Sequence, residues 1–400
     1  MAKKILIFSY PGAGHLNILK EFIKQFSSTY KIQLVITGWK NIPPDLDNLK
    51  TPPIILAKST LKETDPALWT FPRVYELLND CLQITKKFKP DLIIYDYFSL
   101  EGYFVGTLLK IPYWCSISAL VGPFNNQKYL ANRLSSSINK NAIQKIKQKY
   151  NLVINQDKIE MISDGLHIPG QLNLIWSYQS VTSKNFLLNR QKSKYVFVGN
   201  IRARKHPKQL KKNKPLVYLS FGTIVMNILW DQQKDTRIRL KKFISQLAKL
   251  WQHQPITIIF SSQGKKILAK YPANWQVFDK VDQIKVLPKT NISITHGGGN
   301  SFHESLVQQV PMIVIPFFGD QPLVAKKVEE LKIGINLVKN DIIDTKKSKD
   351  FLNKNLANKL HAAVFQFLKN NRDQKNFTKI NLAHTPIKTL LNQQVSLSKH

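Results

Sequence analysis

Three consecutive glycines interrupt the chain between a short apolar run and a segment with helical character. Residues 292–295 predict a strand and residues 301–309 predict a helix. A glycine-rich turn between a strand and a helix exposes backbone N–H groups at the positive end of the helix dipole, where phosphate binds readily. A carboxylate, Glu304, lies one helical turn on, and Asp320 and Gln321 follow a second apolar run. This combination favours a site for a nucleotide joined to a sugar.

Length and composition indicate a globular protein. The chain has 400 residues, of which 43% are hydrophobic, and this is enough for two domains with separate cores. The two cysteines, Cys81 and Cys115, lie in apolar surroundings and indicate a reducing compartment rather than a disulfide framework. The apolar run at residues 5–8 is too short for a signal peptide. We therefore expect a cytoplasmic protein.

The charge is unusual, because 59 Lys and Arg residues against 25 Asp and Glu residues give +34. Such an excess attracts polyanions. The lysines are spread along the chain without a nucleic-acid-binding motif, so we expect no specific nucleic acid partner. A lysine-rich composition on ordinary solvated faces is the favoured interpretation, and peripheral contact with an anionic membrane is the alternative.

Alternating strand and helix patterns predict a parallel α/β sheet in each half. Residues 129–162 are polar and predict a helical insertion over the sheet edge, without a strand. Residues 201–214 contain seven Lys or Arg residues and no acid, which is typical of a linker. We expect a first domain at 1–200, a second at 215–375, and a terminal segment, 376–400, that packs back on the first.

Polar residues follow two strands of the first half. His15 comes after a glycine-rich turn behind the first strand, and Asp96 ends a later strand. Ligands in open α/β sheets bind at the carboxyl ends of strands, so the two side chains could meet there. The imidazole would act as a general base, and the carboxylate would fix its tautomer. Taken alone, His15 is also compatible with a simple loop or capping histidine.

The second half offers phosphate and ribose ligands. Thr223 follows a strand and a glycine, and His296 and Asn300 flank the three glycines. Ser301 is a candidate N-cap with Glu304 three residues later, as in a capping box, and His303 is expected on the surface.

No metal site is expected. Asp45 and Asp47 resemble a metal-binding Asp-x-Asp pair but lie in a proline-rich loop. No Cys or His cluster has zinc spacing, and neither a Walker A motif nor a full dinucleotide fingerprint is present.

The segment from Gln283 to Gln321 resembles the donor-binding signature of family 1 glycosyltransferases, the nucleotide-sugar-dependent enzymes with the GT-B fold. Its Thr-His-Gly-Gly-Gly-Asn-Ser-Phe-His-Glu run, 295–304, and its Asp-Gln pair match that pattern without a gap. Residues 11–15, 90–96, 197–199 and 219–223 also match at the expected places. The Gly-Gly-Gly form resembles bacterial members. Lys280 and Asp282 depart from the pattern, because many relatives have a tryptophan and a proline there.

The resemblance implies α/β architecture with two Rossmann-like parallel-sheet domains facing across a cleft, and a role for each matching residue. His15 would be the general base and Asp96 its orienting partner. Within the donor site, Thr223, His296, Asn300 and Ser301 would hold the diphosphate, Glu304 the ribose, Gln283 the uracil edge, and Asp320 with Gln321 the sugar. The implied donor-binding set is Gly14, Thr223, Gln283, His296, Gly298, Asn300, Ser301, Glu304, Asp320 and Gln321.

The expected activity is inverting, metal-independent transfer of a hexose, with glucose favoured by Gln321, from a UDP-sugar to a hydroxyl of a small acceptor. No cofactor is expected. An apolar acceptor, such as a natural product or lipid, is suggested by Trp69, Phe71, Tyr97, Phe98 and Phe124, although core packing explains many of these equally well. Two alternatives remain: a nucleotide-sugar epimerase on the same fold and a non-catalytic nucleotide-sugar-binding protein.

Overall fold

The structure, a computed structural model, describes residues 3–38, 49, 51–56, 70–121, 127–162, 165–182, 194–209, 214–338, 352, 354–370 and 374–397. It divides into two compact units, residues 1–201 with 383–400 and residues 202–382. The sequence-based candidates Asp45, Asp47, Trp69 and Phe124 lie outside the described residues.

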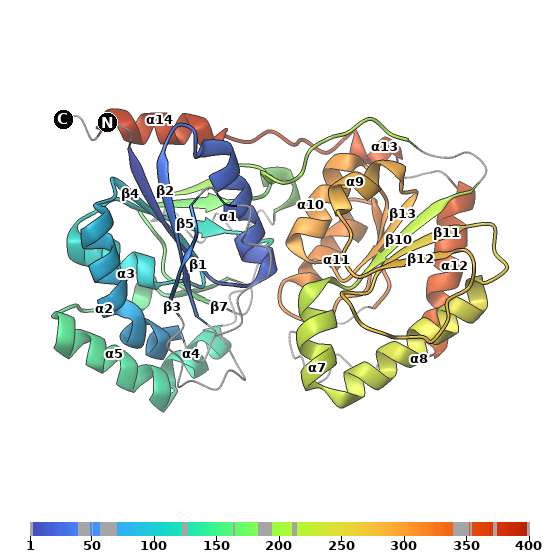
Figure 1. Ribbon diagram of the computed structural model, residues 1–400, viewed down its shortest axis with the longest axis horizontal. Coiled ribbons are helices and arrows are strands. Elements are labelled where there is room, and N and C mark those ends of the chain that lie inside the picture. Colours follow the sequence, from blue (N-terminus) through green and yellow to red (C-terminus); the bar gives the residue numbers. More distant parts are fainter. Residues whose placement is uncertain are drawn as a thin grey trace. The chain divides into compact units, whose positions relative to one another are not determined.

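A seven-stranded parallel sheet forms the centre of the first unit, with the strand order β3-β2-β1-β4-β5-β8-β9 (Figure 1). The order reverses between β1 and β4, which are neighbours in the sheet but far apart in sequence. Its strands are β1 (Lys4–Ser9), β2 (Lys31–Thr37), β3 (Ile54–Leu56), β4 (Leu92–Asp96), β5 (Tyr113–Ile117), β8 (Leu172–Ile175) and β9 (Tyr195–Phe197).

Both faces of this sheet are buried, because successive side chains of a strand point to opposite sides. Leu6 and Phe8 pack in one core with α2 (Thr70–Phe88) and α3 (Glu101–Leu109). Ile5 and Ile7 pack in the other core with α1 (Ala13–Phe26) and α14 (Ile387–Leu397). This two-sided burial explains why the strands are apolar without a polar face.

The segment at 129–162 differs from expectation. It forms α4 (Gln127–Ser135), α5 (Ser137–Tyr150) and the turn η1 (Gln156–Lys158), but it ends in a strand, β6 (Glu160–Ile162). This strand pairs antiparallel with β7 (Gly165–His167), so the prediction of no strand was wrong. The α5 helix packs against α2.

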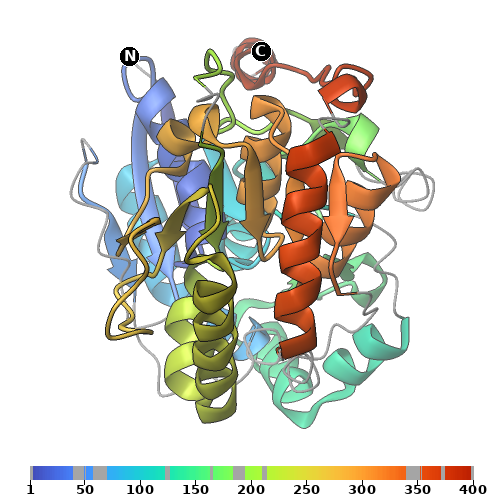
Figure 2. The same ribbon diagram turned by 90° about the vertical axis from the view of Figure 1, so that its right-hand side faces the viewer.

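The second unit repeats the design with a six-stranded parallel sheet, in the order β12-β11-β10-β13-β14-β15. The helices α8 (Lys234–Trp251) and α12 (Lys354–Asn370) run beside each other and cover one face (Figures 1 and 2). The strands are β10 (Leu216–Ser220), β11 (Thr257–Ser261), β12 (Trp275–Phe278), β13 (Ile292–Thr295), β14 (Met312–Val314) and β15 (Gly334–Asn336).

Several shorter helices follow the strands of this second sheet. They are η3 (Ile224–Leu229), α7 (Trp230–Gln232), α9 (Gln283–Val286), η4 (Leu287–Lys289), α10 (Gly299–Gln308), α11 (Gln321–Glu330) and α13 (Gln374–Phe377).

The chain crosses between the units twice. Residues 202–209, expected to be part of a linker, pack on the second unit, where Gln308 and the backbone of His206 exchange hydrogen bonds of 2.8 and 2.9 Å. Residues 376–382 also belong to that unit, whereas 383–400 join the first. There the Thr385 N–H donates to the Phe197 carbonyl, and α14 buries Leu390 and Leu391.

Candidate active site

The first part of the site lies where β1 and β4 end side by side. Phe8 of β1 is in register with Tyr95 of β4, so both strands deliver the following residues to the same edge of the sheet. His15 lies in the first turn of α1, and Asp96 is the last residue of β4. This is the topological switch point, where ligands of open α/β sheets bind.

His15 and Asp96 form the contact that was predicted from the sequence. The imidazole Nδ1 lies 3.0 Å from each carboxylate oxygen of Asp96. The Asp96 side chain is fully buried, while that of His15 keeps 13% exposure. The Phe98 N–H donates to Asp96 Oδ1 at 2.9 Å, which further fixes the carboxylate. Because Asp96 accepts from Nδ1, the other ring nitrogen, Nε2, is left to accept a proton.

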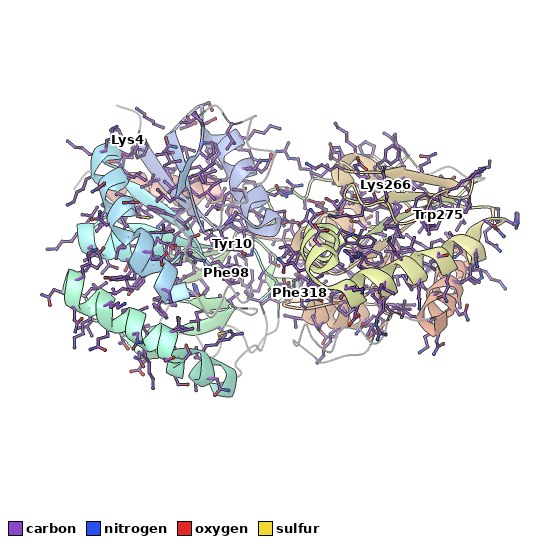
Figure 3. The ribbon with its side chains drawn as sticks, turned by 60° about the horizontal axis from the view of Figure 1, so that its bottom comes forward. Lys4, Tyr10, Phe98, Lys266, Trp275 and Phe318 are labelled. Atoms are coloured by element: carbon purple, nitrogen blue, oxygen red, sulfur yellow. The ribbon has the colours of Figure 1, made fainter. Side chains whose placement is uncertain are left out.

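Aromatic rings surround the imidazole. Tyr97 stacks on His15 with centroids 5.1 Å apart, and the rings of Phe98 and Tyr10 lie at 4.9 and 5.2 Å. Tyr10 and Phe98 also contact each other at 5.3 Å (Figure 3). The sequence points to Tyr97 and Phe98 but not to Tyr10, and all three belong to the same hydrophobic core as Phe71. The imidazole therefore lies in an apolar environment.

A buried ion pair supports the turn after Asp96. Arg73 Nε donates to Glu101 Oε1 at 2.9 Å, and the Arg73 guanidinium also donates to the Phe98 carbonyl. Thr37 donates to Glu101 Oε2 at 3.2 Å. Arg73 and Glu101 are 7% and 0% exposed, so neither charge has much contact with water. The pair connects α2 and α3 to the segment that positions Asp96.

Gly14 differs from the other predicted donor ligands. It is exposed in the first turn of α1, and a Cβ atom at this position would meet nothing within 4 Å. No close packing therefore demands a glycine here. Its assignment to donor binding depends on the sequence resemblance.

The second unit has its own switch point, between β10 and β13, where Ser220 is in register with Thr295. Gly222 follows β10 with φ +72°, and Gly297 follows β13 with φ +87°. The imidazole of His296 lies so close to Gly222 that a Cβ there would be 2.3 Å from its Cε1 atom. A Cβ at Gly298 would lie 2.6 Å from Nε2. The glycines thus provide the space that His296 occupies.

His296 is held neutral. Burial lowers its pKa to about 4, a shift that the backbone of Ser220 opposes only in part. Its Nδ1 atom is buried and has no hydrogen-bond partner among the described residues. Such an unpartnered buried nitrogen inside the glycine-rich turn can pair with a polar group of a bound ligand.

The helix α10 begins at Gly299 with Gly298 as its N-cap residue, and no side chain caps it. The prediction of Ser301 as N-cap in a capping box with Glu304 was therefore wrong, because the N-cap position lies three residues earlier, at Gly298. Gly299, Asn300 and Ser301 form the first turn, so their N–H groups lie at the positive end of the dipole. This geometry agrees with the predicted phosphate site.

Glu304 is the centre of a polar chain. Gln283 Nε2 donates to its Oε2 at 2.8 Å, and Ser301 Oγ donates to Gln283 Oε1 at 3.3 Å. On the other side, Arg202 Nε donates to Glu304 Oε1 at 3.0 Å. Burial raises the pKa of Glu304 and Arg202 opposes that rise. The sequence predicts Glu304, Gln283 and Ser301 as donor ligands, but it places Arg202 in a linker.

His303 is fully buried, so its prediction as a surface residue was wrong. Its Nδ1 lies 2.7 Å from the Gly299 carbonyl, and burial lowers its pKa to about 4. The helix α10 is buried on nearly all sides, so its sequence lacks the periodic alternation of apolar and polar residues from which the burial of His303 could be predicted.

Three further predicted residues lie at helix starts. Thr223 precedes η3, and Asp320 is the N-cap residue of α11. Gln321 follows, and its Oε1 accepts from the N–H groups of Phe317 and Phe318 at 2.8 and 3.1 Å. Because the carbonyl end is thereby occupied, the Gln321 amide presents its NH₂ group as a donor.

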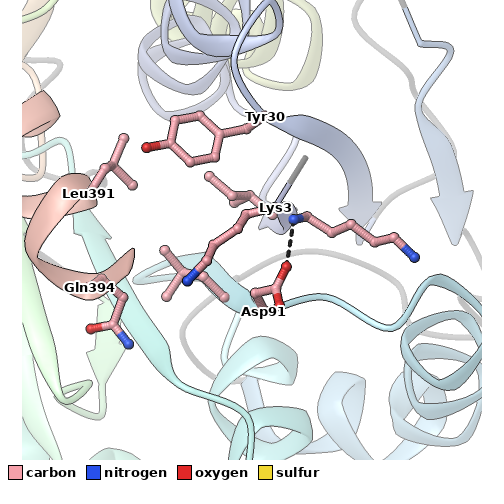
Figure 4. A pocket seen from close by; sticks show the side chains of 8 residues that line it. Lys3, Tyr30, Asp91, Leu391 and Gln394 are labelled. Atoms are coloured by element: carbon pink, nitrogen blue, oxygen red, sulfur yellow. Dashed lines mark hydrogen bonds between the residues drawn. The ribbon is translucent and has the colours of Figure 1, made fainter. Parts of the chain in front are cut away.

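One pocket lies at the opposite end of the first sheet. It is lined by the start of β1, by Asp91 before β4, and by Leu391 and Gln394 of α14 (Figure 4). Asp91 accepts from the Lys4 N–H at 2.8 Å there. This pocket lies at the strand starts and is therefore separate from His15. Within the described ranges, no three His, Cys, Asp or Glu residues are grouped as a metal site would require.

Cys81 and Cys115 are buried and free. No helix in the described part of the chain is long and apolar enough to cross a membrane.

Part of the chain matches a known protein family. Residues 194–359 match the family described as UDP-glucoronosyl and UDP-glucosyl transferase, and this range contains every predicted donor residue of the second unit. NDP-glycosyltransferase YjiC of Bacillus subtilis (strain 168) is 27% identical over 297 residues, covering 71% of this chain and 69% of that protein.

Solved structures show the same fold. The crystal structure of the glycotransferase of kitacinnamycin has a TM-score of 0.72 at 17% identity, and the alignment covers 98% of both chains. The spinosyn rhamnosyltransferase SpnG, complexed with thymidine diphosphate, has a TM-score of 0.60 at 14% identity, with 94% of this chain and 95% of that chain covered. The predicted GT-B fold class, with two Rossmann-like parallel-sheet domains, is confirmed.

Proposed function

Because this chain belongs to family 1 of the glycosyltransferases, in its bacterial form, we propose that it transfers a hexose, first of all glucose, from a UDP-sugar to a hydroxyl group of a small apolar acceptor. The observation that carries this proposal is the contact of His15 Nδ1 with both oxygens of the buried Asp96. A tethered imidazole at the switch point is suited to proton abstraction.

In the proposed reaction, His15 Nε2 takes the proton of the acceptor hydroxyl. The acceptor oxygen attacks the anomeric carbon as the bond from that carbon to the diphosphate oxygen breaks, and UDP departs with the electron pair. A single displacement inverts the configuration. Asp96 stabilises the imidazolium that forms, because its carboxylate already accepts from Nδ1.

The second unit supports the departure of UDP. The N–H groups at the start of α10 and the neutral His296 can stabilise the developing negative charge on the diphosphate without a metal ion. Glu304 would accept from the ribose, and Asp320 with the NH₂ group of Gln321 would hold the sugar hydroxyls. A donor NH₂ group suits a neutral hexose, which offers hydroxyl oxygens as acceptors.

The aromatic rings around His15 support an apolar acceptor. The charge of +34 supports a second part of the proposal, that this cytoplasmic enzyme contacts anionic lipid at the membrane surface. Sedimentation with anionic liposomes at low salt tests that part, and absence of binding would remove it without affecting the transferase proposal.

The decisive experiment screens acceptors with radiolabelled UDP-glucose and measures both UDP release and labelled product. The parent should release UDP only when an acceptor is present. His15→Ala should still bind UDP-glucose but should release no UDP. His253→Ala is the matched control, because His253 is exposed. Conversion of the UDP-sugar without an acceptor would instead indicate an epimerase. Binding of UDP-sugar without release, across the acceptor panel, would indicate a non-catalytic binding protein.

A further inference from the structure

Arg202 lies where the chain enters the second unit, since the first unit ends at Ile201. From there residues 202–209 follow α10 closely. Arg202 contacts Glu304, His206 contacts Gln308 one helical turn later, and Lys208 Nζ donates to the Gln309 carbonyl at 2.7 Å. The crossing segment is thus docked along the helix that carries the proposed donor site.

The Arg202 contact is made to a buried charge. The side chain of Glu304 is 4% exposed and that of Arg202 is 25% exposed. A carboxylate removed from water tends to become protonated unless a positive charge or hydrogen-bond donors compensate. The charge of Arg202 opposes the rise in the pKa of Glu304 that burial causes, and the hydrogen bond from Gln283 acts in the same direction as Arg202. The nearby charge of Asp282 raises that pKa further.

The remaining capacity of Glu304 matches a sugar diol. An ionised carboxylate has about four acceptor sites. Arg202 and Gln283 occupy one on each oxygen, which leaves about two for incoming hydroxyl groups. A protonated Glu304 would lose acceptor capacity and would no longer suit two hydroxyl donors.

From these contacts we propose that Arg202 is a positioning residue of the donor site, which keeps Glu304 ionised and oriented for the vicinal hydroxyls of a nucleoside diphosphate. This inference rests on the proposed function, because it takes Glu304 as the ribose ligand. It adds a residue outside the glycine-rich motif and makes nucleotide affinity depend on the docked crossing segment.

The test measures UDP binding to the full-length protein by calorimetry between pH 5.5 and 8. Arg202→Gln should weaken UDP binding about tenfold at neutral pH, the loss expected for one charge-assisted contact. The loss should grow as the pH falls, because Glu304 without its cation is protonated at higher pH. Arg202→Lys should recover part of the affinity. Lys205→Gln is the control, with the same charge change at an exposed position of the same segment.

A double-mutant cycle separates positioning from a general structural role. In a Glu304→Gln background, Arg202→Gln should cost little further affinity, because no charge remains to be held. If the two losses are additive, or if Arg202→Gln shows no greater pH dependence than the parent, the role of Arg202 is refuted. If Glu304→Gln itself leaves UDP binding unchanged, the proposed ribose contact fails instead.

Discussion

His15 Nδ1 lies 3.0 Å from both carboxylate oxygens of Asp96, a residue 81 positions later in the chain. The distance in sequence is bridged because β1 and β4 are neighbours in the sheet, at the point where its order reverses. The polar residues after each strand are therefore brought to one place by the fold.

Replacement of Asp96 should slow turnover without weakening the binding of the UDP-sugar donor. Asp96→Asn keeps the shape but can no longer stabilise an imidazolium or enforce one tautomer, so kcat should fall about 10²–10⁴-fold. UDP affinity, measured by calorimetry, should stay unchanged. Because the two residues act as a unit, Asp96→Asn in a His15→Ala background should have little added effect. Independent, multiplicative losses would contradict the proposed pair.

The Arg73–Glu101 ion pair should contribute strongly to the stability of the first unit. Arg73→Met leaves the Glu101 carboxylate buried without its cation, which should cost about 3–5 kcal/mol. Amide hydrogen exchange of residues 92–101 in a low concentration of urea should be faster in Arg73→Met than in the parent. Lys86→Met, on the exposed face of the same helix, should have no such effect. Equal exchange in both variants would show that the ion pair is not needed.

Several features of this site were predictable because they depend on local pattern. Strands end where apolar runs end, which placed Asp96 at the edge of the sheet. Glycines before a helix indicated a candidate phosphate site. Arg202 was not predictable, since a basic stretch without periodicity looks the same whether it is solvated or docked on α10.

The start of α10 was misjudged for a related reason. Glycine has a low helix propensity, so the residue types do not predict a helix that begins at Gly299. The strand β6 was missed because only three residues form it, and its antiparallel pairing with β7 depends on a partner outside the predicted insertion.

His303 should make the second unit sensitive to acid. Its pKa is lowered from 6.5 to about 4 in the folded state, so the unfolded chain binds more protons between these values. Its stabilising contribution is complete above about pH 6.5 and is lost as the pH falls toward 4, by about 3 kcal/mol at most. Urea unfolding at several pH values should show a smaller loss in His303→Gln than in the parent, while the exposed His253→Gln should behave as the parent. A His303→Gln profile identical to the parent's would contradict the assignment.

Gly222 and Gly264 provide a matched pair that tests the space around His296. Both have positive φ, +72° and +77°, so alanine at either position should carry a similar backbone strain of about 1–2 kcal/mol. Only at Gly222 would the new Cβ collide with the imidazole, at 2.3 Å from Cε1, whereas at Gly264 nothing lies within 4 Å. We therefore expect Gly222→Ala to displace His296 and weaken UDP binding about tenfold or more, and Gly264→Ala to lower the unfolding midpoint slightly with UDP affinity intact. Calorimetry and thermal unfolding of the two variants measure both effects. Equal UDP affinities would show that the position of His296 does not matter for the donor, and the phosphate role of this histidine would then have to be abandoned.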